Sequence, residues 1–587
     1  MKNAFAIVTL SALMATHAMA QTPVVPANAP AAPVAASPDA PDGKPTALPN
    51  VDLNSELLYK LTKAELEFKN GQWQGPYVTM MMAAQQTRDP RLARRASEMA
   101  LAAKQGGEAL AAIRLWRELA PDSDEATQFF LGFVVLSDKI EEAEPIFAQR
   151  IEAAPPGARG VALFQTQQIL ARAGDKLYAY SMLVRLMEPY LDLFEAHLVL
   201  AQGALSIGER DRAIAEANKA LAIKPASELA VLTLAQVSGE PQAAGKVLSD
   251  FLEKNPDAIE VRAAYARLLV EQKQLEPARA QFLALLKTQP DNVGGLYALG
   301  IVSLQLEDAK GAEQYFKRFL AVLEKNPGED RDPFKALLIL SQIAEARNDI
   351  PGAIAWLDKV DSSASGGYLD ARLRRAQLMA RSGDLDGARK TLAETKVDDP
   401  AAQGQIFLVD AQLLRDAGYV PSAFTVLENA LLRLPDNPEL LYDYALLAER
   451  LDKLELMEKS LRRVMQIAPD NQHAYNALGY SLAERNIRLP EALALIERAL
   501  QMAPGDPFIM DSMGWVQFRM GNLAAAEDVL RRAYAVRPDP EIAVHLGEVL
   551  WQKGDKDSAQ KLWREAQAKD PKNDALKSTL ARLNVSL

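Results

Sequence analysis

Small and large apolar residues recur with a period of about 34 residues towards the end of this chain, between Asn476 and Pro571. Three segments align there. Each has an early glycine, then an alanine after a turn, a large apolar residue four positions later, a second alanine and a closing proline. These positions are Gly479, Ala492, Ile496, Ala499 and Pro504; Gly514, Ala526, Leu530, Ala533 and Pro538; and Gly547, Ala559, Trp563, Ala566 and Pro571.

The spacing predicts a pair of helices in each segment. In the middle segment Ala526, Leu530 and Ala533 stand at i, i+4 and i+7, so they share one face of the second helix. The first helix carries Gly514, which we expect where the second helix approaches too closely for a side chain. Pro538 ends the second helix because proline cannot continue its hydrogen bonds.

This period and this small–large–small pattern resemble the tetratricopeptide repeat. Prolines recur about one repeat apart from Pro121 onwards, which predicts about fourteen or fifteen helix pairs after residue 50. The resemblance implies an all-α, right-handed α-solenoid with a groove lined by the first helices. We expect divergent repeats over 51–330 and better-kept repeats over 331–587, with the best match at 470–571.

The N-terminal stretch has the features of an export signal. Residues 1–20 combine Lys2, an apolar core and the small residues Ala18 and Ala20 before Gln21, which predicts a cleavable signal peptide. A buried N-terminal helix is the alternative. Residues 21–50 are rich in proline and alanine and predict a disordered linker.

Charge and cysteine content narrow the class of protein. The formal net charge of −11 argues against nucleic acid as the main partner, since phosphate binding needs a basic face. The absence of cysteine excludes disulfides, thiolate metal sites and a lipid-bearing N-terminal cysteine. No second apolar span follows the signal. We therefore expect a periplasmic protein, held at the outer membrane at most through its partners; secretion beyond the cell is the alternative.

The sequence shows no arrangement of residues that is typical of an enzyme. Beyond residue 20 the chain has three histidines, His197, His473 and His545, far apart in sequence. We interpret each as a surface or groove residue. No hydrolase, metalloprotease or nucleotide-binding motif occurs in a usable context. We expect no enzyme activity, no cofactor and no metal; a hydrolase hidden in the divergent N-terminal third is the alternative.

The resemblance also implies which side chains line the groove. In this repeat family they step two, five, nine, twelve and thirteen positions along the unit, with the glycine at position eight. Aromatic residues gather at these places and are typical anchors for protein partners. The alternative is that the rings pack against the next repeat. The candidate partner-binding residues are His473, Asn476, Tyr480, Asp511, Trp515, Phe518, Arg519, Glu548 and Trp551.

The whole chain resembles a group of exported proteobacterial repeat proteins. The shared features are the signal, the linker and a C-terminal block that includes NALGYSLAERNIRLPEALALIERAL, DSMGWVQFRMGNLAAAEDVLRRA and HLGEVLWQKGD. That group includes the adaptor of a periplasmic carboxyl-terminal processing protease. The resemblance implies a scaffold that joins such a protease to peptidoglycan hydrolases. This chain lacks the adaptor's lipid-bearing cysteine. A component of envelope polysaccharide assembly or export is the alternative.

Overall fold

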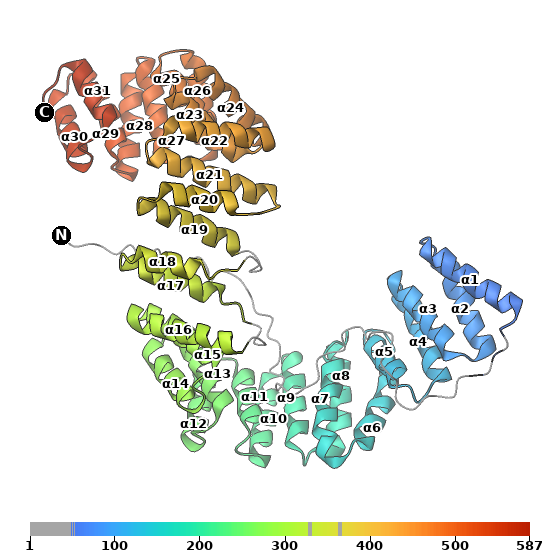
Figure 1. The fold of residues 1–587 in the computed structure, drawn as a ribbon. Helices are drawn as coiled ribbons and strands as arrows, with labels where there is room; N and C mark the ends of the chain where they lie inside the picture. The colour runs from blue at the N-terminus through green and yellow to red at the C-terminus, as the bar shows by residue number, and fades with distance from the viewer. Residues whose placement is uncertain (1–48, 50, 52, 327–330, 362–366) are drawn as a thin grey trace. The chain divides into compact units, whose positions relative to one another are not determined.

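The computed structural model describes residues 49, 51, 53–326, 331–361 and 367–587, and all regular structure within them is helical (Figure 1). The predicted signal peptide at 1–20 and nearly all of the predicted linker at 21–50 lie outside these residues. The chain divides into two compact units, Met1–Gln272 and Lys273–Leu587.

The first unit contains consecutive helices joined by short turns, some of which form single 3-10 turns at Ile140–Ala143, Pro156–Ala158 and Glu188–Tyr190. Its α-helices are α1 (Ser55–Lys69), α2 (Gln74–Thr87), α3 (Pro90–Ala102), α4 (Gly106–Leu119), α5 (Asp124–Val134), α6 (Glu144–Ala153), α7 (Arg159–Leu170), α8 (Lys176–Met187), α9 (Phe194–Ser206), α10 (Arg210–Ile223), α11 (Glu228–Ser238), α12 (Pro241–Lys254) and α13 (Ile259–Glu271).

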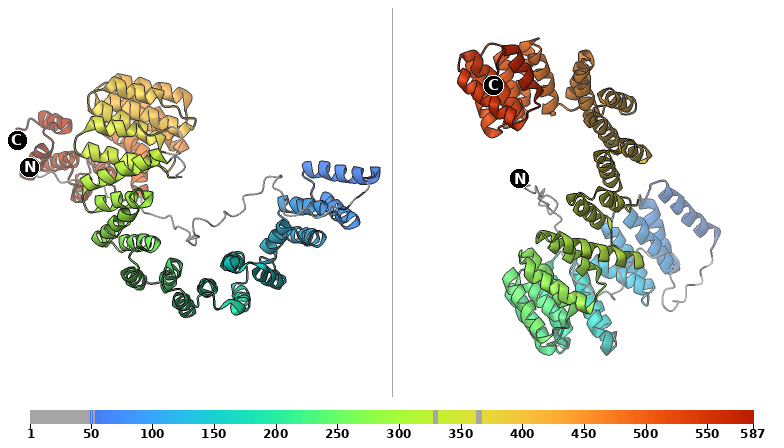
Figure 2. Two further views of the ribbon diagram at one scale, coloured as in Figure 1. Left: turned by 60° about the horizontal axis from the view of Figure 1, so that its bottom comes forward. Right: turned by 60° about the vertical axis from the view of Figure 1, so that its left-hand side comes forward.

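In the second unit, successive helix pairs lie side by side in chain order (Figures 1 and 2). Its α-helices are α14 (Leu275–Thr288), α15 (Val293–Gln305), α16 (Ala309–Lys325), α17 (Phe334–Ala346), α18 (Ile350–Leu357), α19 (Tyr368–Arg381), α20 (Leu385–Glu394), α21 (Pro400–Asp416), α22 (Val420–Arg433), α23 (Pro438–Arg450), α24 (Leu454–Ile467), α25 (Gln472–Glu484), α26 (Leu489–Met502), α27 (Pro507–Arg519), α28 (Leu523–Val536), α29 (Pro540–Lys553), α30 (Lys556–Lys569) and α31 (Asp574–Leu583).

The all-α solenoid that the sequence predicts is confirmed. The described residues hold α-helices α1 to α31, which agrees with about fourteen or fifteen pairs. The predicted change from divergent to better-kept repeats at residue 330 concerns repeat similarity and stays a prediction. No helix among the described residues combines the length and the apolar character that crossing a bilayer requires.

The three C-terminal glycines stand where two helices of one pair meet, as the spacing predicts. A Cβ atom built on Gly514 would come within 3.0 Å of the side chain of Leu530. Ile496 and Trp563 stand in the same relation to the glycines of their own repeats, at positions 479 and 547. Each large apolar residue therefore fills the space that the missing glycine side chain leaves.

The alanines and prolines of the pattern also have their predicted roles. The six alanines are at most 1% exposed. Because they are small, they let the second helix of each repeat lie close to its neighbours. Helices α26, α28 and α30 end at Met502, Val536 and Lys569, each two residues before the closing proline.

Side chains at the turns explain where the first helices begin. Helices α27 and α29 start with Pro507 and Pro540. Proline lacks a backbone N–H, and the first position of a helix has no partner for one within the helix. The side chains of Asp506 and Asp539 accept hydrogen bonds from free N–H groups of the first turn.

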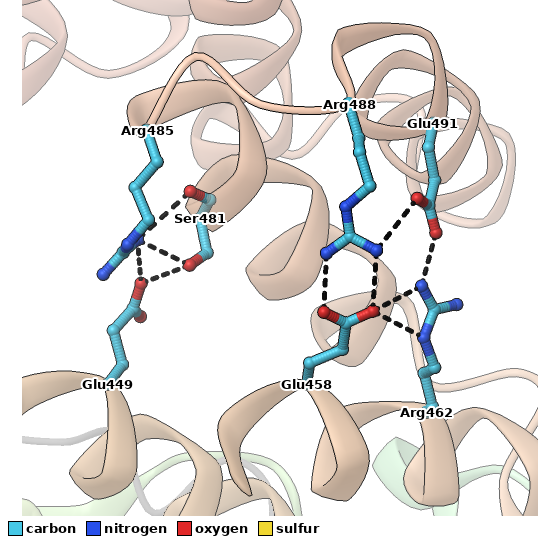
Figure 3. A network of polar contacts seen from close by, with 7 residues as sticks. All are labelled: Glu449, Glu458, Arg462, Ser481, Arg485, Arg488 and Glu491. Carbon is cyan, nitrogen blue, oxygen red and sulfur yellow. Dashed lines mark hydrogen bonds and ion pairs between the residues drawn. The ribbon is translucent and has the colours of Figure 1, made fainter. Parts of the chain in front are cut away.

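An ion-pair network joins the second helices of two successive repeats, α24 and α26 (Figure 3). The Glu458 carboxylate receives hydrogen bonds from Arg488 Nη2 at 2.6 Å and from Arg462 Nη2 at 2.7 Å. Arg462 also bonds to Glu491. The hydrogen bonds from Arg488 lower the pKa of Glu458 to about 2, against the opposing effect of partial burial.

A second network in Figure 3 joins the first helices of the same two repeats, α23 and α25. Arg485 Nη1 donates to Glu449 Oε1 over 2.8 Å, and the Ser481 hydroxyl donates to the same oxygen. Polar side chains therefore tie neighbouring repeats together through both layers of helices.

The interpretation of His197 as a surface or groove residue was wrong. The residue is 6% exposed, and its Nδ1 lies 2.6 Å from Glu216 Oε2 while its Nε2 lies 3.0 Å from the carbonyl oxygen of Leu191. Both ring nitrogens have partners within the first unit, so His197 has a structural role.

Candidate partner-binding site

The first helices of the last repeats, α25, α27, α29 and α31, are linked by side chains that stand one repeat apart in the sequence. Asp511 contacts His545 and Glu548 contacts Arg582, and each pair is separated by 34 residues. Equivalent positions of neighbouring repeats face each other when repeats stack. The repeat period therefore brings acids of one helix against cations or donors of the next.

His545 lies at the centre of this group, and its interpretation as a surface or groove residue was wrong. It is 4% exposed, with Nδ1 2.8 Å from Asp511 Oδ2 and its ring stacked 4.3 Å from that of Trp515. Nε2 faces the Tyr480 hydroxyl at 3.5 Å. Burial disfavours the charged ring, but the neighbouring Asp511 carboxylate outweighs it, and the pKa of His545 lies above its ordinary value.

Trp515 packs between repeats. The residue is 3% exposed, its Nε1 donates to Glu484 Oε2 over 2.7 Å, and its second face carries the Phe518 ring at 5.1 Å. The indole is therefore enclosed on both sides. The structure favours the alternative that we gave for these rings, packing against the next repeat, in the case of Trp515.

Three further candidates lie on α25. His473 is exposed, with its ring 6.4 Å from that of Tyr442. Asn476 Oδ1 is buried and has no hydrogen-bond partner among the described residues. Burial raises the pKa of Tyr480 far above its ordinary value. The structure places these side chains along α25, away from the pocket described next.

Four of the candidates come together at one pocket of about 410 Å³. It lies beside α27, α29 and α31 and the turn after α25. Its lining combines two aromatic rings, two guanidinium groups, two side-chain amides, one carboxylate and one leucine. These residues are Asn486, Phe518, Arg519, Glu548, Trp551, Gln552, Arg582 and Leu583.

The two arginines of this pocket differ in their partners. Arg582 Nη2 donates to Glu548 Oε2 over 2.6 Å, and this buried carboxylate also faces the Thr579 hydroxyl at 3.4 Å. Arg519 Nη2 donates to the carbonyl oxygen of Glu484 over 3.0 Å, and its guanidinium lies 5.7 Å from the Trp515 ring. Among the described residues, Arg519 has no carboxylate partner.

Three pocket residues lie outside the positions that counting from the repeat glycines names: Asn486, Arg582 and Leu583. Asn486 lies in the turn after α25, and the other two lie at the end of α31, outside the stretch 470–571 where the repeat pattern is clearest. One signal was available for Arg582, because it follows Glu548 by 34 residues. A charge of opposite sign one repeat later predicts a contact between neighbouring first helices.

The described residues contain no group of three histidine, aspartate or glutamate side chains arranged to hold a metal ion. The pocket contains aromatic and guanidinium side chains, which are enriched at protein interfaces.

Family models of the tetratricopeptide repeat match four stretches of this chain. One model matches residues 238–299, and a second matches 297–368, 454–507 and 512–574. Over these stretches the chain matches the tetratricopeptide repeat. The last two of them include α25, most of α27 and α29, so the pocket lies on matched stretches together with the helix that follows them.

Three curated proteins have similar sequences. A TPR repeat-containing protein of Pseudomonas aeruginosa is 39% identical over 210 residues, 36% of this chain and 35% of that protein. Cellulose synthase operon protein C of Pseudomonas fluorescens is 24% identical over 356 residues, 52% of this chain and 27% of that protein. Type IV pilus assembly protein PilF of P. aeruginosa is 29% identical over 183 residues, 30% of this chain and 69% of that protein. The chain thus spans about a third or less of the first two relatives.

Among solved structures, a thermophilic TPR protein of Thermus thermophilus is 25% identical and covers 31% of this chain and 99% of its own, with a TM-score of 0.28. The Cut9–Hcn1 hetero-tetramer is 14% identical and covers 90% of this chain and 96% of its own, with a TM-score of 0.33.

Proposed function

We propose that this tetratricopeptide repeat protein is a non-enzymatic scaffold that binds protein partners, and that the C-terminal repeats are one docking region. The observation that carries the proposal is the pocket beside α27, α29 and α31. It presents aromatic rings and a guanidinium that has no carboxylate partner among the described residues, and such groups dominate the affinity of protein interfaces. Stacked repeats provide an extended surface on which more than one partner can bind.

In the finer form of this proposal, the scaffold works in the periplasm and joins a carboxyl-terminal processing protease to peptidoglycan hydrolases. Its support is the signal-like segment at residues 1–20 and the resemblance of the C-terminal block to the adaptor of such a protease. The chain differs from that adaptor in having no cysteine in this sequence.

The similarity to cellulose synthase operon protein C favours a second candidate, a scaffold for the assembly or export of an envelope polysaccharide. That similarity extends over 52% of this chain, more than either of the other two relatives covers. The two candidates share the scaffold role and differ in the partner.

Affinity capture with residues 21–587 from periplasmic extract, followed by mass spectrometry, tests the proposal. Recovery of a processing protease with wall hydrolases supports the first form, and recovery of polysaccharide synthase or export subunits supports the second. The double variant Arg519→Glu, Trp551→Gln should lose captured proteins that Arg498→Glu, on the exposed side of α26, retains. A capture in which no protein is recovered reproducibly would contradict both forms of the proposal.

A further inference from the structure

The pocket beside α27, α29 and α31 has its polar groups at both ends and its apolar surface between them. At one end Arg519 reaches the end of α25, where it bonds to the carbonyl oxygen of Glu484. At the other end Arg582, on α31, bonds to Glu548. Phe518 and Trp551 lie between these ends, on α27 and α29. A ligand that covers the rings therefore extends towards a guanidinium on either side.

The two arginines of the pocket differ in the groups to which their guanidinium groups bond. The buried Glu548 carboxylate and Arg582 neutralise each other, so that end is polar and carries little net charge. Arg519 is only half-buried and pairs with a carbonyl oxygen. The Glu484 carboxylate is bonded to Trp515 Nε1, so it does not occupy the N–H groups of Arg519. Among the described residues the Arg519 guanidinium therefore has no carboxylate partner, and a carboxylate is the group that matches a guanidinium in charge and shape.

The middle of the pocket suits an apolar side chain. Phe518 and Trp551 are partly exposed, and both are held in place by other rings: Phe518 by Trp515 at 5.1 Å and Trp551 by Trp563 at 5.5 Å. Rings fixed in this way lose little freedom when a ligand covers them. The side-chain amides of Asn486 and Gln552 supply donors and acceptors for a peptide backbone.

We propose that this pocket binds an internal segment of a protein partner in which an aspartate or glutamate adjoins a large apolar residue, with the carboxylate on Arg519 and the apolar side chain on Phe518 and Trp551. The inference rests on the proposed scaffold function and specifies the chemistry of its partner. An internal segment fits better than a chain end, because the polar groups lie beyond both edges of the apolar surface.

Binding of short fluorescent peptides to residues 21–587, measured by fluorescence anisotropy, tests this inference. The probe peptide is acetylated and amidated and carries one glutamate next to one phenylalanine in a glycine–serine background. Matched peptides replace the glutamate by glutamine, replace the phenylalanine by alanine, or carry their one carboxylate at a free C-terminus. We expect the first peptide to bind at least about tenfold more tightly than each of the others. The glutamine and free-C-terminus peptides lose the charge-assisted hydrogen bond to Arg519, and the alanine peptide loses apolar surface buried on the two rings.

The variants locate the binding site. Arg519→Gln should weaken binding of the glutamate peptide about tenfold and leave the weak binding of the glutamine peptide unchanged. Arg498→Gln is the matched control, since this exposed arginine of α26 has no ion pair among the described residues and lies outside the pocket. Hydrogen exchange of α27 in both variants verifies that the repeats stay folded.

Three results would overturn the inference: no binding of the glutamate peptide, equal binding by the wild type and Arg519→Gln, or tighter binding of the peptide with a free C-terminus. Each is distinct from failure of the proposed function. If the wild type captures partners from extract and the double variant Arg519→Glu, Trp551→Gln captures the same partners, the chain is a scaffold whose partners dock elsewhere.

Discussion

The carboxylate of Asp511 and the imidazole of His545 form a buried pair 2.8 Å apart, although 34 residues separate them in the sequence. Asp511 lies on α27 and His545 on α29, so the pair connects two successive repeats. Glu484 on α25 and Glu541 on α29 add further negative charge around the ring, and Tyr480 faces it with a neutral hydroxyl. These surroundings favour the protonated form of the histidine.

The raised pKa of His545 predicts that the last repeats lose stability as the pH rises. The pKa of His545 in the folded protein lies above the ordinary value of 6.5. Its contribution to the stability of the folded repeats is therefore complete below pH 6.5 and is lost as the pH rises through the folded pKa. Hydrogen exchange of α29 should therefore become less protected above pH 6.5 in the wild type. His545→Gln should lack this dependence, and His473→Gln, at an exposed position, should keep it. A dependence that survives in His545→Gln would contradict the assignment.

The lowered pKa of Glu458 predicts a dependence of the opposite sign between α24 and α26. The contribution of Glu458 to the stability of the folded state is complete above its ordinary pKa of 4.5, and it is lost as the pH falls through the folded pKa of about 2. Since the arginines are partly exposed, Glu458→Gln should cost only about 1 kcal/mol of local opening free energy at pH 7.

Hydrogen exchange of α24 and α26 measures this cost at several pH values. The difference between Glu458→Gln and the wild type should shrink from pH 4.5 downwards. Glu497→Gln, an exposed glutamate of α26, is the control and should resemble the wild type throughout. A difference that persists unchanged at the lowest pH would show that the substitution acts through something other than charge.

Gly514→Ala should destabilise its repeat because the added methyl group enters the space of Leu530. The new Cβ would come within 3.0 Å of that side chain, and overpacking of this kind costs about 2 kcal/mol. Gly505→Ala is the matched control, since a Cβ there meets nothing within 4 Å. Protection of α27 and α28 in hydrogen exchange should fall in the first variant alone. Equal protection in both variants would refute the close-packing role of Gly514.

Trp515→Phe should weaken the link between α25 and α27 while it keeps an aromatic ring beside Phe518. The variant loses the hydrogen bond from Nε1 to Glu484 Oε2, and a bond to a charged group is worth about 2 kcal/mol. Trp551→Phe keeps an aromatic ring in the pocket and serves as the comparison. We expect faster exchange of α25 only in Trp515→Phe. Loss of affinity for the glutamate peptide in that variant would show that the buried indole takes part in binding.

The local pattern of the sequence predicted the helix pairs because their contacts are close in the chain. Gly514 meets Leu530 within one hairpin, so the spacing of small and large residues defines the contact directly. The contacts between repeats were harder to predict. The lone histidine at 545 gave no sign of burial, since its partner Asp511 lies one repeat earlier and the match depends on how the two repeats align.

The candidate site was predicted in part, because some of its residues follow the spacing of the repeats. Counting from the repeat glycines placed Phe518, Arg519, Glu548 and Trp551 on one surface, and the structure gathers them at one pocket. The count could not separate Trp515 from them, because burial depends on the residues that a neighbouring helix presents. It also ended before α31, which follows the last clear repeat and supplies Arg582.

Helix α31 has a consequence for shortening this array. The side chain of Glu548 is only 4% exposed, and its partners Arg582 and Thr579 both come from α31. A variant that stops before Asp574 would leave a carboxylate facing the former interface without a counter-charge. Repeat arrays need an end unit with a polar outer face to stay soluble. Without α31 the protein would instead end in an acidic, partly apolar surface, so removal of α31 alone calls for a second substitution at Glu548.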